Sequence, residues 1–217
     1  MSEFATRRVM MVDTQVRPSD VTKFPIIDAM LTVPREIFVP DDKREAAYVG
    51  ENLTLSPGRV VLEARTLAKL LDALDIRPTE LVLDVGSGLG YSAAVIARLA
   101  ETVVAVEEDT GLATEAQRLL SEAGVDNAVV VTGALAEGSA KCAPYDVITI
   151  EGGVEVVPAA ILDQLKDGGR IGAIFMENAV GTARIGYKTG GQITWRSVFN
   201  AGAPVLPGFA KARGFAL

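Results

Sequence analysis

The chain has 217 residues, of which 49% are hydrophobic and 23% charged, and its net charge is −7. This balance is typical of a globular protein with a large core, and the negative charge disfavours a nucleic-acid partner. The chain has no histidine and one cysteine, Cys142, which excludes an internal disulfide and leads us to predict no metal site. No apolar run approaches the roughly 20 residues of a membrane span, and no secretory signal is visible, so we expect a cytoplasmic protein.

Residues 1–79 are predicted to form a helical cap on the substrate side of the molecule. An amphipathic pattern predicts a short helix that has Ile26, Ile27, Met30 and Leu31 on one face and ends at Pro34. A second helix is predicted for residues 63–76, where leucines recur at helical spacing.

Residues 80–217 are predicted to form the cofactor-binding core, because strand and helix patterns alternate there. This alternation is typical of a parallel sheet covered by helices on both faces. A hairpin that turns at Gly190 and Gly191 is expected to add an antiparallel edge. Strands are predicted at 81–86, 102–107, 127–133, 145–153 and 170–176, and helices at 91–100, 111–124 and 157–169.

A glycine-rich turn follows the first of these strands. Gly86, Gly88 and Gly90 give the spacing G-x-G-x-G, whereas a dinucleotide fingerprint has its third glycine one residue later, where Tyr91 stands here. The spacing resembles the first motif of S-adenosylmethionine methyltransferases, so this cofactor is predicted. Ser87 lies in the turn, and Asp84 just before it suits contact with the cofactor ammonium.

Glu107 ends the second predicted strand, and Glu108 follows it. A carboxylate at this place can accept hydrogen bonds from both ribose hydroxyls. Proteins that bind NAD also have an acid here, so the glycine spacing discriminates between the two cofactors and Glu107 does not.

Three stretches resemble the protein-L-isoaspartate O-methyltransferase family: residues 29–48 with a VPRE-FVP element, 82–100, and 143–171 with a DQLK-x-GG element. The resemblance implies a Rossmann-like sheet of seven strands and methyl transfer from S-adenosylmethionine to isoaspartyl residues of proteins. The acceptor carboxylate is already ionised at neutral pH, so the reaction needs no base.

The sequence departs from this family at positions that the resemblance places in the site. The family has a G-Q-T-I-S segment where residues 58–62 stand here, so Arg59 takes the glutamine position and Leu62 that of the active-site serine. Both are retained as candidate catalytic residues. Gly133, Ala134 and Leu135 replace the family's Gly-Asp-Gly and so lack the aspartate that would meet the adenine.

Glu151 opens a segment that is usually made of small residues in the family. In one interpretation, Glu151 takes over from Ala134 as a partner of adenine or substrate, and Arg59 supplies the lost polar contacts by holding a carboxylate. In the other, the chain methylates a different protein or small-molecule acceptor, or binds the cofactor without catalysis. The tail, residues 200–217, is unlike the family's ending, and packing over the sheet and contact with a partner subunit both stay open.

Overall fold

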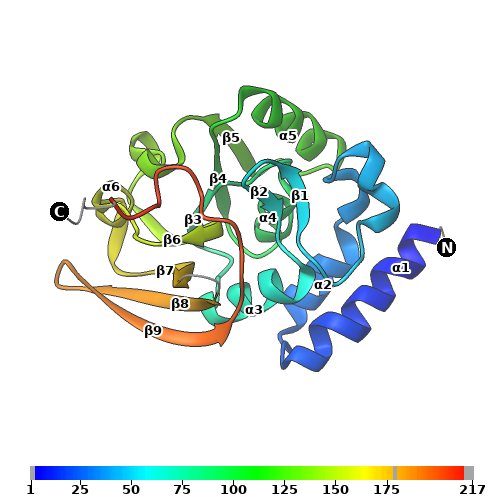
Figure 1. Cartoon of the computed structure of the whole chain (residues 1–217), viewed down its shortest axis with the longest axis horizontal. Helices are drawn as coiled ribbons and strands as arrows, with labels where there is room; N and C mark the ends of the chain where they lie inside the picture. The colour runs from blue at the N-terminus through cyan, green and yellow to red at the C-terminus, as the bar shows by residue number, and fades with distance from the viewer. Residues whose placement is uncertain (1–2, 178–179, 213–217) are drawn as a thin grey trace, which may run out of the picture.

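A seven-stranded sheet organises this computed structural model, which describes residues 3–177 and 180–212 (Figure 1). The strand order is β5-β4-β3-β6-β7-β8-β9. Strands β3 to β7 pair in parallel, and β8 pairs antiparallel with β7 on one side and with β9 on the other. The α/β fold and its C-terminal hairpin are therefore confirmed. The bounds are β3 (Leu81–Val85), β4 (Thr102–Glu107), β5 (Ala128–Thr132), β6 (Tyr145–Val154), β7 (Leu165–Glu177), β8 (Val180–Thr189) and β9 (Gln192–Asn200).

Alternate side chains of the central strands enter two different apolar layers. Val82 and Val103 belong to the layer that contains α3 (Ala64–Leu74) and α4 (Tyr91–Ala97), whereas Leu83 and Val104 belong to the layer that contains α6 (Ala159–Asp163). The sheet is thus buried on both faces, as its continuous apolar runs require. Helix α5 (Thr110–Glu122) packs beside β4 and β5.

The N-terminal part contributes α1 (Glu3–Met11), α2 (Phe24–Thr32) and the hairpin of β1 (Leu53–Ser56) and β2 (Arg59–Val61). Helices α2 and α3 match the two helices predicted here; α1 was not predicted. Among the described residues, no helix is long and apolar enough to cross a membrane. Short turns of π- or 3-10-helix lie at Val12–Val16, Arg17–Ser19, Arg35–Ile37, Asp41–Ala46, Leu135–Glu137 and Ala140–Cys142.

The helix predicted for residues 157–169 is shorter in the structure. Helix α6 ends at Asp163 and β7 begins at Leu165, so Gly168 and Gly169 lie inside a strand. Gly168 has a φ of 81°, which a helical residue does not adopt. A Cβ atom on Gly169 would lie 2.9 Å from the backbone oxygen of Asp146, so this glycine allows β7 to approach β6 closely.

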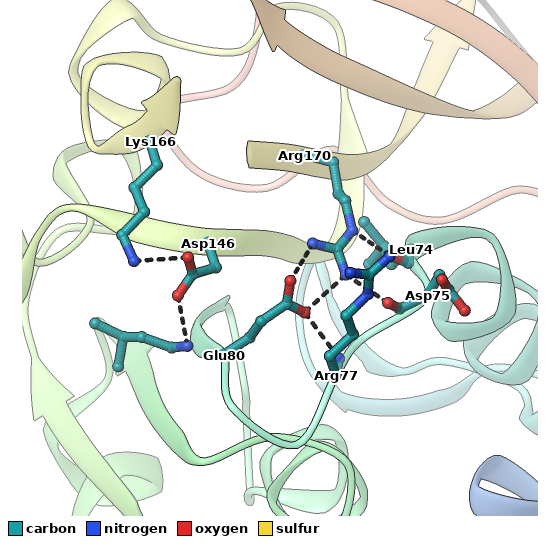
Figure 2. Close-up of polar contacts among 8 residues, drawn as sticks. Leu74, Asp75, Arg77, Glu80, Asp146, Lys166 and Arg170 are labelled. Atoms are coloured by element: carbon teal, nitrogen blue, oxygen red, sulfur yellow. Dashed lines mark hydrogen bonds and ion pairs between the residues drawn. The ribbon is translucent and has the colours of Figure 1, made fainter. Parts of the chain in front are cut away.

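An ion-pair network ties together the amino ends of the central strands, opposite the predicted site (Figure 2). Arg170 of β7 binds both carboxylate oxygens of Glu80 at 2.6 and 2.8 Å and also donates to the backbone oxygens of Leu74 and Asp75. Asp146 of β6 accepts from Lys166 at 2.6 Å and from the backbone N–H of Leu81 at 2.9 Å. These contacts fix the end of α3 and the starts of β3, β6 and β7 relative to one another.

The strand order places a topological switch at β3. From β3 the chain builds β4 and β5 on one side, then returns to place β6 on the other. In sheets of this kind, ligands bind outside the carboxyl ends of the strands at the switch. The carboxyl ends of β3, β4 and β6 are therefore where a site is expected.

Candidate functional site

The glycine-rich turn connects β3 to α4 at this edge of the sheet. Gly86, Gly88 and Gly90 have φ angles of 83°, 58° and 94°, a region that side-chain-bearing residues rarely adopt. A Cβ atom on Gly90 would lie 3.4 Å from Leu120, so this glycine also lets the start of α4 lie close to α5. The backbone N–H of Gly86 donates to Val106 at 2.9 Å, which anchors the turn beside β4.

Glu107, at the end of β4, lies directly against this turn. Its Oε2 accepts from the backbone N–H of Gly88 at 2.9 Å, and its Oε1 accepts from that of Asp109 at 3.1 Å. The structure therefore brings together the two features on which the cofactor prediction depends. The carboxylate is completely buried.

Arg59 occupies the remaining acceptor positions of Glu107. Its Nη1 donates to Oε1 at 2.7 Å and its Nη2 to Oε2 at 2.5 Å, so the pair is bidentate. The side chain of Arg59 is only 5% exposed. In one of the two interpretations of the sequence, Arg59 holds a carboxylate; the carboxylate that it holds in this structure belongs to the protein itself. A carboxylate offers about four lone-pair sites, and in Glu107 all four are used.

Two further acids, Asp84 and Glu151, lie buried beside the turn. Asp84 accepts from the hydroxyl of Ser92 at 2.7 Å, and Glu151 accepts from that of Thr149 at 2.9 Å. Burial raises the pKa of Glu151 to about 7. Burial, followed by the charge of Glu151, also raises the pKa of Asp84 well above its ordinary value. A site with two weakened acids and one ion pair avoids placing three bare negative charges together.

Glu151 owes its position to an irregularity in the sheet. The register between β6 and β7 shifts between Thr149 and Gly153, where four steps along β6 match two along β7 (Gly172 to Ile174). Such a bulge bends the strand and redirects its side chains.

The C-terminal segment, residues 202–209, crosses this edge of the sheet (Figure 1). Its Leu206 covers two glycines: a Cβ atom on Gly152 would lie 2.6 Å from Leu206, and one on Gly86 would lie 3.2 Å away. Leu55 of β1 covers Gly88 in the same way. Leu206 is 2% exposed, so it belongs to the protein core.

Three other candidate site residues lie in environments that differ from one another: Leu62, Tyr91 and Ser87. Leu62 packs in a small apolar cluster that includes Ile174, so the position of the family serine lies in the core. The ring of Tyr91 lies 4.5 Å from the guanidinium carbon of Arg35, which belongs to the N-terminal part. Ser87 is buried in the turn. The contribution of each to cofactor binding stays a prediction.

The residues after β5 and β4 lie around the same edge. The backbone N–H of Gly133 donates to the backbone oxygen of Glu107 at 3.0 Å. Leu135 is fully buried in the layer that also contains Leu206, whereas Ala134 is exposed and Glu108 is partly exposed. Leu135, at the position of the family's second glycine, therefore adds apolar bulk beside this edge.

The cavity left at this edge is small. Its volume is about 10 Å³, which is room for about one water molecule. The residue types suit a nucleoside, but in this conformation Arg59 takes acceptor positions of Glu107, and Leu206 and Leu55 cover the glycine turn. The lining residues are Val60, Val61, Leu62, Leu67, Gly86, Ser87, Tyr91, Ser92 and Glu151.

Sequence reasoning did not identify Leu206 or Leu55 as site residues. Leucines in a hairpin and in an irregular tail carry no local pattern that predicts contact with a turn far away in the chain. The sequence showed an unusual tail and an arginine at the glutamine position. It did not show that both lie at the glycine turn.

Comparison with known proteins places this geometry in a family. The family model described as protein-L-isoaspartate(D-aspartate) O-methyltransferase matches residues 8–182. A protein-L-isoaspartate O-methyltransferase from Koribacter versatilis is 37% identical over 171 residues, which cover 79% of this chain and 77% of that protein. One from Syntrophus aciditrophicus is 34% identical over 171 residues, or 79% and 78% of the two chains.

Solved structures share the fold. A protein-L-isoaspartate O-methyltransferase structure superposes with a TM-score of 0.80 at 24% identity, over 93% of this chain and 66% of that one. This chain thus spans just under two thirds of that structure's length. A Plasmodium falciparum structure in complex with S-adenosyl-L-homocysteine superposes with a TM-score of 0.78 at 17% identity, over 95% and 99% of the two chains.

Proposed function

We propose, because this chain belongs to the protein-L-isoaspartate O-methyltransferase family, that it methylates the carboxylate of isoaspartyl residues in proteins. Members of this family are methyltransferases that use S-adenosylmethionine, which agrees with the enzyme class and the cofactor predicted from the glycine spacing. The proposal adds the acceptor and the residues of this chain that serve it.

One observation carries the residue assignment: the N–H of Gly88 lies 2.9 Å from the carboxylate of Glu107, at the switch point of the sheet. A flexible glycine turn and a buried acid in this arrangement suit the amino-acid part and the ribose of the cofactor. We also propose that Asp84 and Glu151 belong to this site, and that residues 1–79 cap its substrate side.

The experiment is transfer of a labelled methyl group to an isoaspartyl peptide, with the same peptide containing ordinary aspartate as control. We expect label in the isoaspartyl peptide alone, released by mild base as expected for a methyl ester. Label in neither peptide, from a protein that binds S-adenosylhomocysteine, would refute the isoaspartyl acceptor.

A different methyl acceptor is the second candidate, and the surroundings of Leu62 favour it. This side chain packs in the core at the place of the family serine and offers no hydrogen bond to an isoaspartyl group. In the peptide experiment, this candidate predicts binding of S-adenosylhomocysteine without label in either peptide.

A further inference from the structure

The space and the acceptor atoms that a nucleoside needs are both taken by the chain itself. Arg59 takes two acceptor positions of the Glu107 carboxylate. Leu206 covers Gly86 and Gly152, and Leu55 covers Gly88. A neighbouring pocket, lined among others by Gly86 and Glu151, has a volume of about 10 Å³.

We propose that Arg59 and the tail segment, residues 202–209, form an internal plug that competes with the cofactor for one site. This inference rests on the proposed function, because it takes S-adenosylmethionine as the competing ligand. In the closed state that the structure describes, Arg59 stands in for the ribose hydroxyls at Glu107. Leu206 fills the space above the glycine turn.

The attachment of the tail segment suits displacement as a unit. Its pairing with the sheet is one isolated bridge between Val205 and Gly153, rather than a strand ladder. The N–H of Gly153 donates to Pro204 at 2.8 Å and that of Leu206 donates to Gly153 at 2.9 Å. The segment is also held by a hydrogen bond from the Asn52 amide to the backbone oxygen of Gly202 at 2.8 Å and by the buried side chains of Ala203, Leu206 and Phe209. The backbone oxygen of Phe209 accepts two hydrogen bonds.

Exchange of Arg59 for the cofactor must leave the Glu107 carboxylate hydrogen-bonded. Removal of Arg59 alone would leave a buried charge without its partner, at a large cost in free energy, so the ligand has to supply donors of its own there. Two ribose hydroxyls can replace the two N–H donors of Arg59 at Glu107, and the guanidinium regains water outside the site. The measured affinity for the cofactor then equals the intrinsic affinity reduced by the fraction of molecules that are open.

Calorimetric titration with S-adenosylhomocysteine tests the plug through binding rather than activity. We expect R59Q and L206A each to bind at least about 10-fold more tightly than the unaltered chain, since each raises the open fraction. The matched controls are R98Q and V198A, which change an exposed arginine and an exposed valine away from the site. Circular dichroism and thermal unfolding verify that each variant is folded.

Each outcome separates the plug from the proposed function. If the unaltered chain, R59Q and L206A bind equally tightly, the plug is refuted and the cofactor assignment stands. If no folded variant binds S-adenosylhomocysteine, the proposed function fails and the plug fails with it. Tighter binding by R98Q or V198A, to the same degree, would also overturn the plug.

Hydrogen exchange gives an independent readout on the same samples. Binding of S-adenosylhomocysteine should speed exchange at the backbone amides of Gly153 and Leu206, because displacement of the tail segment breaks both of their hydrogen bonds. If the ligand binds and these two amides exchange more slowly, the tail segment stays in place and the proposal is wrong.

Discussion

Arg59 and Glu107 lie 48 residues apart in the chain, and folding buries both side chains as one ion pair. Their pair is bidentate, and two backbone N–H groups complete the carboxylate's hydrogen bonds. A buried charge is tolerated only when it is paired in this way. Replacing one partner should therefore lower the free energy of unfolding much more than replacing both.

We expect E107A to lower the free energy of unfolding by about 3–5 kcal/mol, because it leaves the Arg59 guanidinium buried without a counter-charge. Urea denaturation measures the change, with E108A as the matched control at the next residue. The double variant R59Q/E107Q should be less destabilised than E107A. Equal loss in both would contradict an uncompensated charge as the cause.

The raised pKa values of Glu151 and Asp84 predict that the free energy of unfolding falls as the pH rises. The pKa of Glu151 is raised to about 7 in the folded protein, against an ordinary value of 4.5. Between these two values the folded state holds a proton that the unfolded state has lost, so the contribution of Glu151 is fully present below about 4.5 and lost by about 7. The raised pKa of Asp84 acts in the same direction.

The measurement is urea denaturation at several pH values between 4.5 and 8. We expect E151Q to show a shallower decline than the unaltered chain across this range, and E137Q, at an exposed acid, to leave the decline unchanged. The steepest slope that one group can contribute is about 1.4 kcal/mol per pH unit. If the stability of E151Q declines as steeply as that of the unaltered chain, groups other than Glu151 cause the decline.

At the scale of the elements, the two ends of the central strands have different polar chemistry. At the amino ends, Arg170 and Lys166 pair with Glu80 and Asp146 and bind backbone groups of neighbouring elements (Figure 2). These contacts hold α3, β3, β6 and β7 in place. At the carboxyl ends lie the glycine turn, the tail segment and the two acids with raised pKa values, Asp84 and Glu151.

We expect R170A to lower the free energy of unfolding by about 2–4 kcal/mol, because it frees the mostly buried Glu80 carboxylate and two backbone oxygens at once. R98A removes an exposed ion pair and should cost about 0.2–1 kcal/mol. Chemical denaturation of both variants measures the difference. Similar losses for R170A and R98A would show that the network contributes no more than a surface pair.

At the scale of the whole molecule, the site is assembled from five distant parts of the chain. The hairpin supplies Arg59, the first βα turn supplies the glycines, β4 supplies Glu107, β6 supplies Glu151 and the tail segment supplies Leu206. The N-terminal helices and the central strands share one apolar layer, so the hairpin that carries Arg59 is held against the sheet. Closure of the site is thus a property of the complete fold.

Local patterns were sufficient to predict most of the elements. The alternation of apolar runs with helical spacing predicted the parallel sheet, and the pair Gly190–Gly191 predicted the terminal hairpin, because strand and turn preferences act within a few residues. The same reasoning failed for residues 164–169. There, close approach of Gly169 to β6 decides in favour of a strand, and that contact involves a residue far away in the chain.

The sequence by itself determined the fold class, the family, the glycine turn and the acid that ends β4, since each depends on residue types at short spacing. Only the tertiary structure decided what meets that acid. Arg59 and Leu206 reach the glycine turn through long-range packing, and no local pattern records the direction of a side chain across a folded core. Side-chain contacts across the fold therefore decide whether the predicted pocket is open.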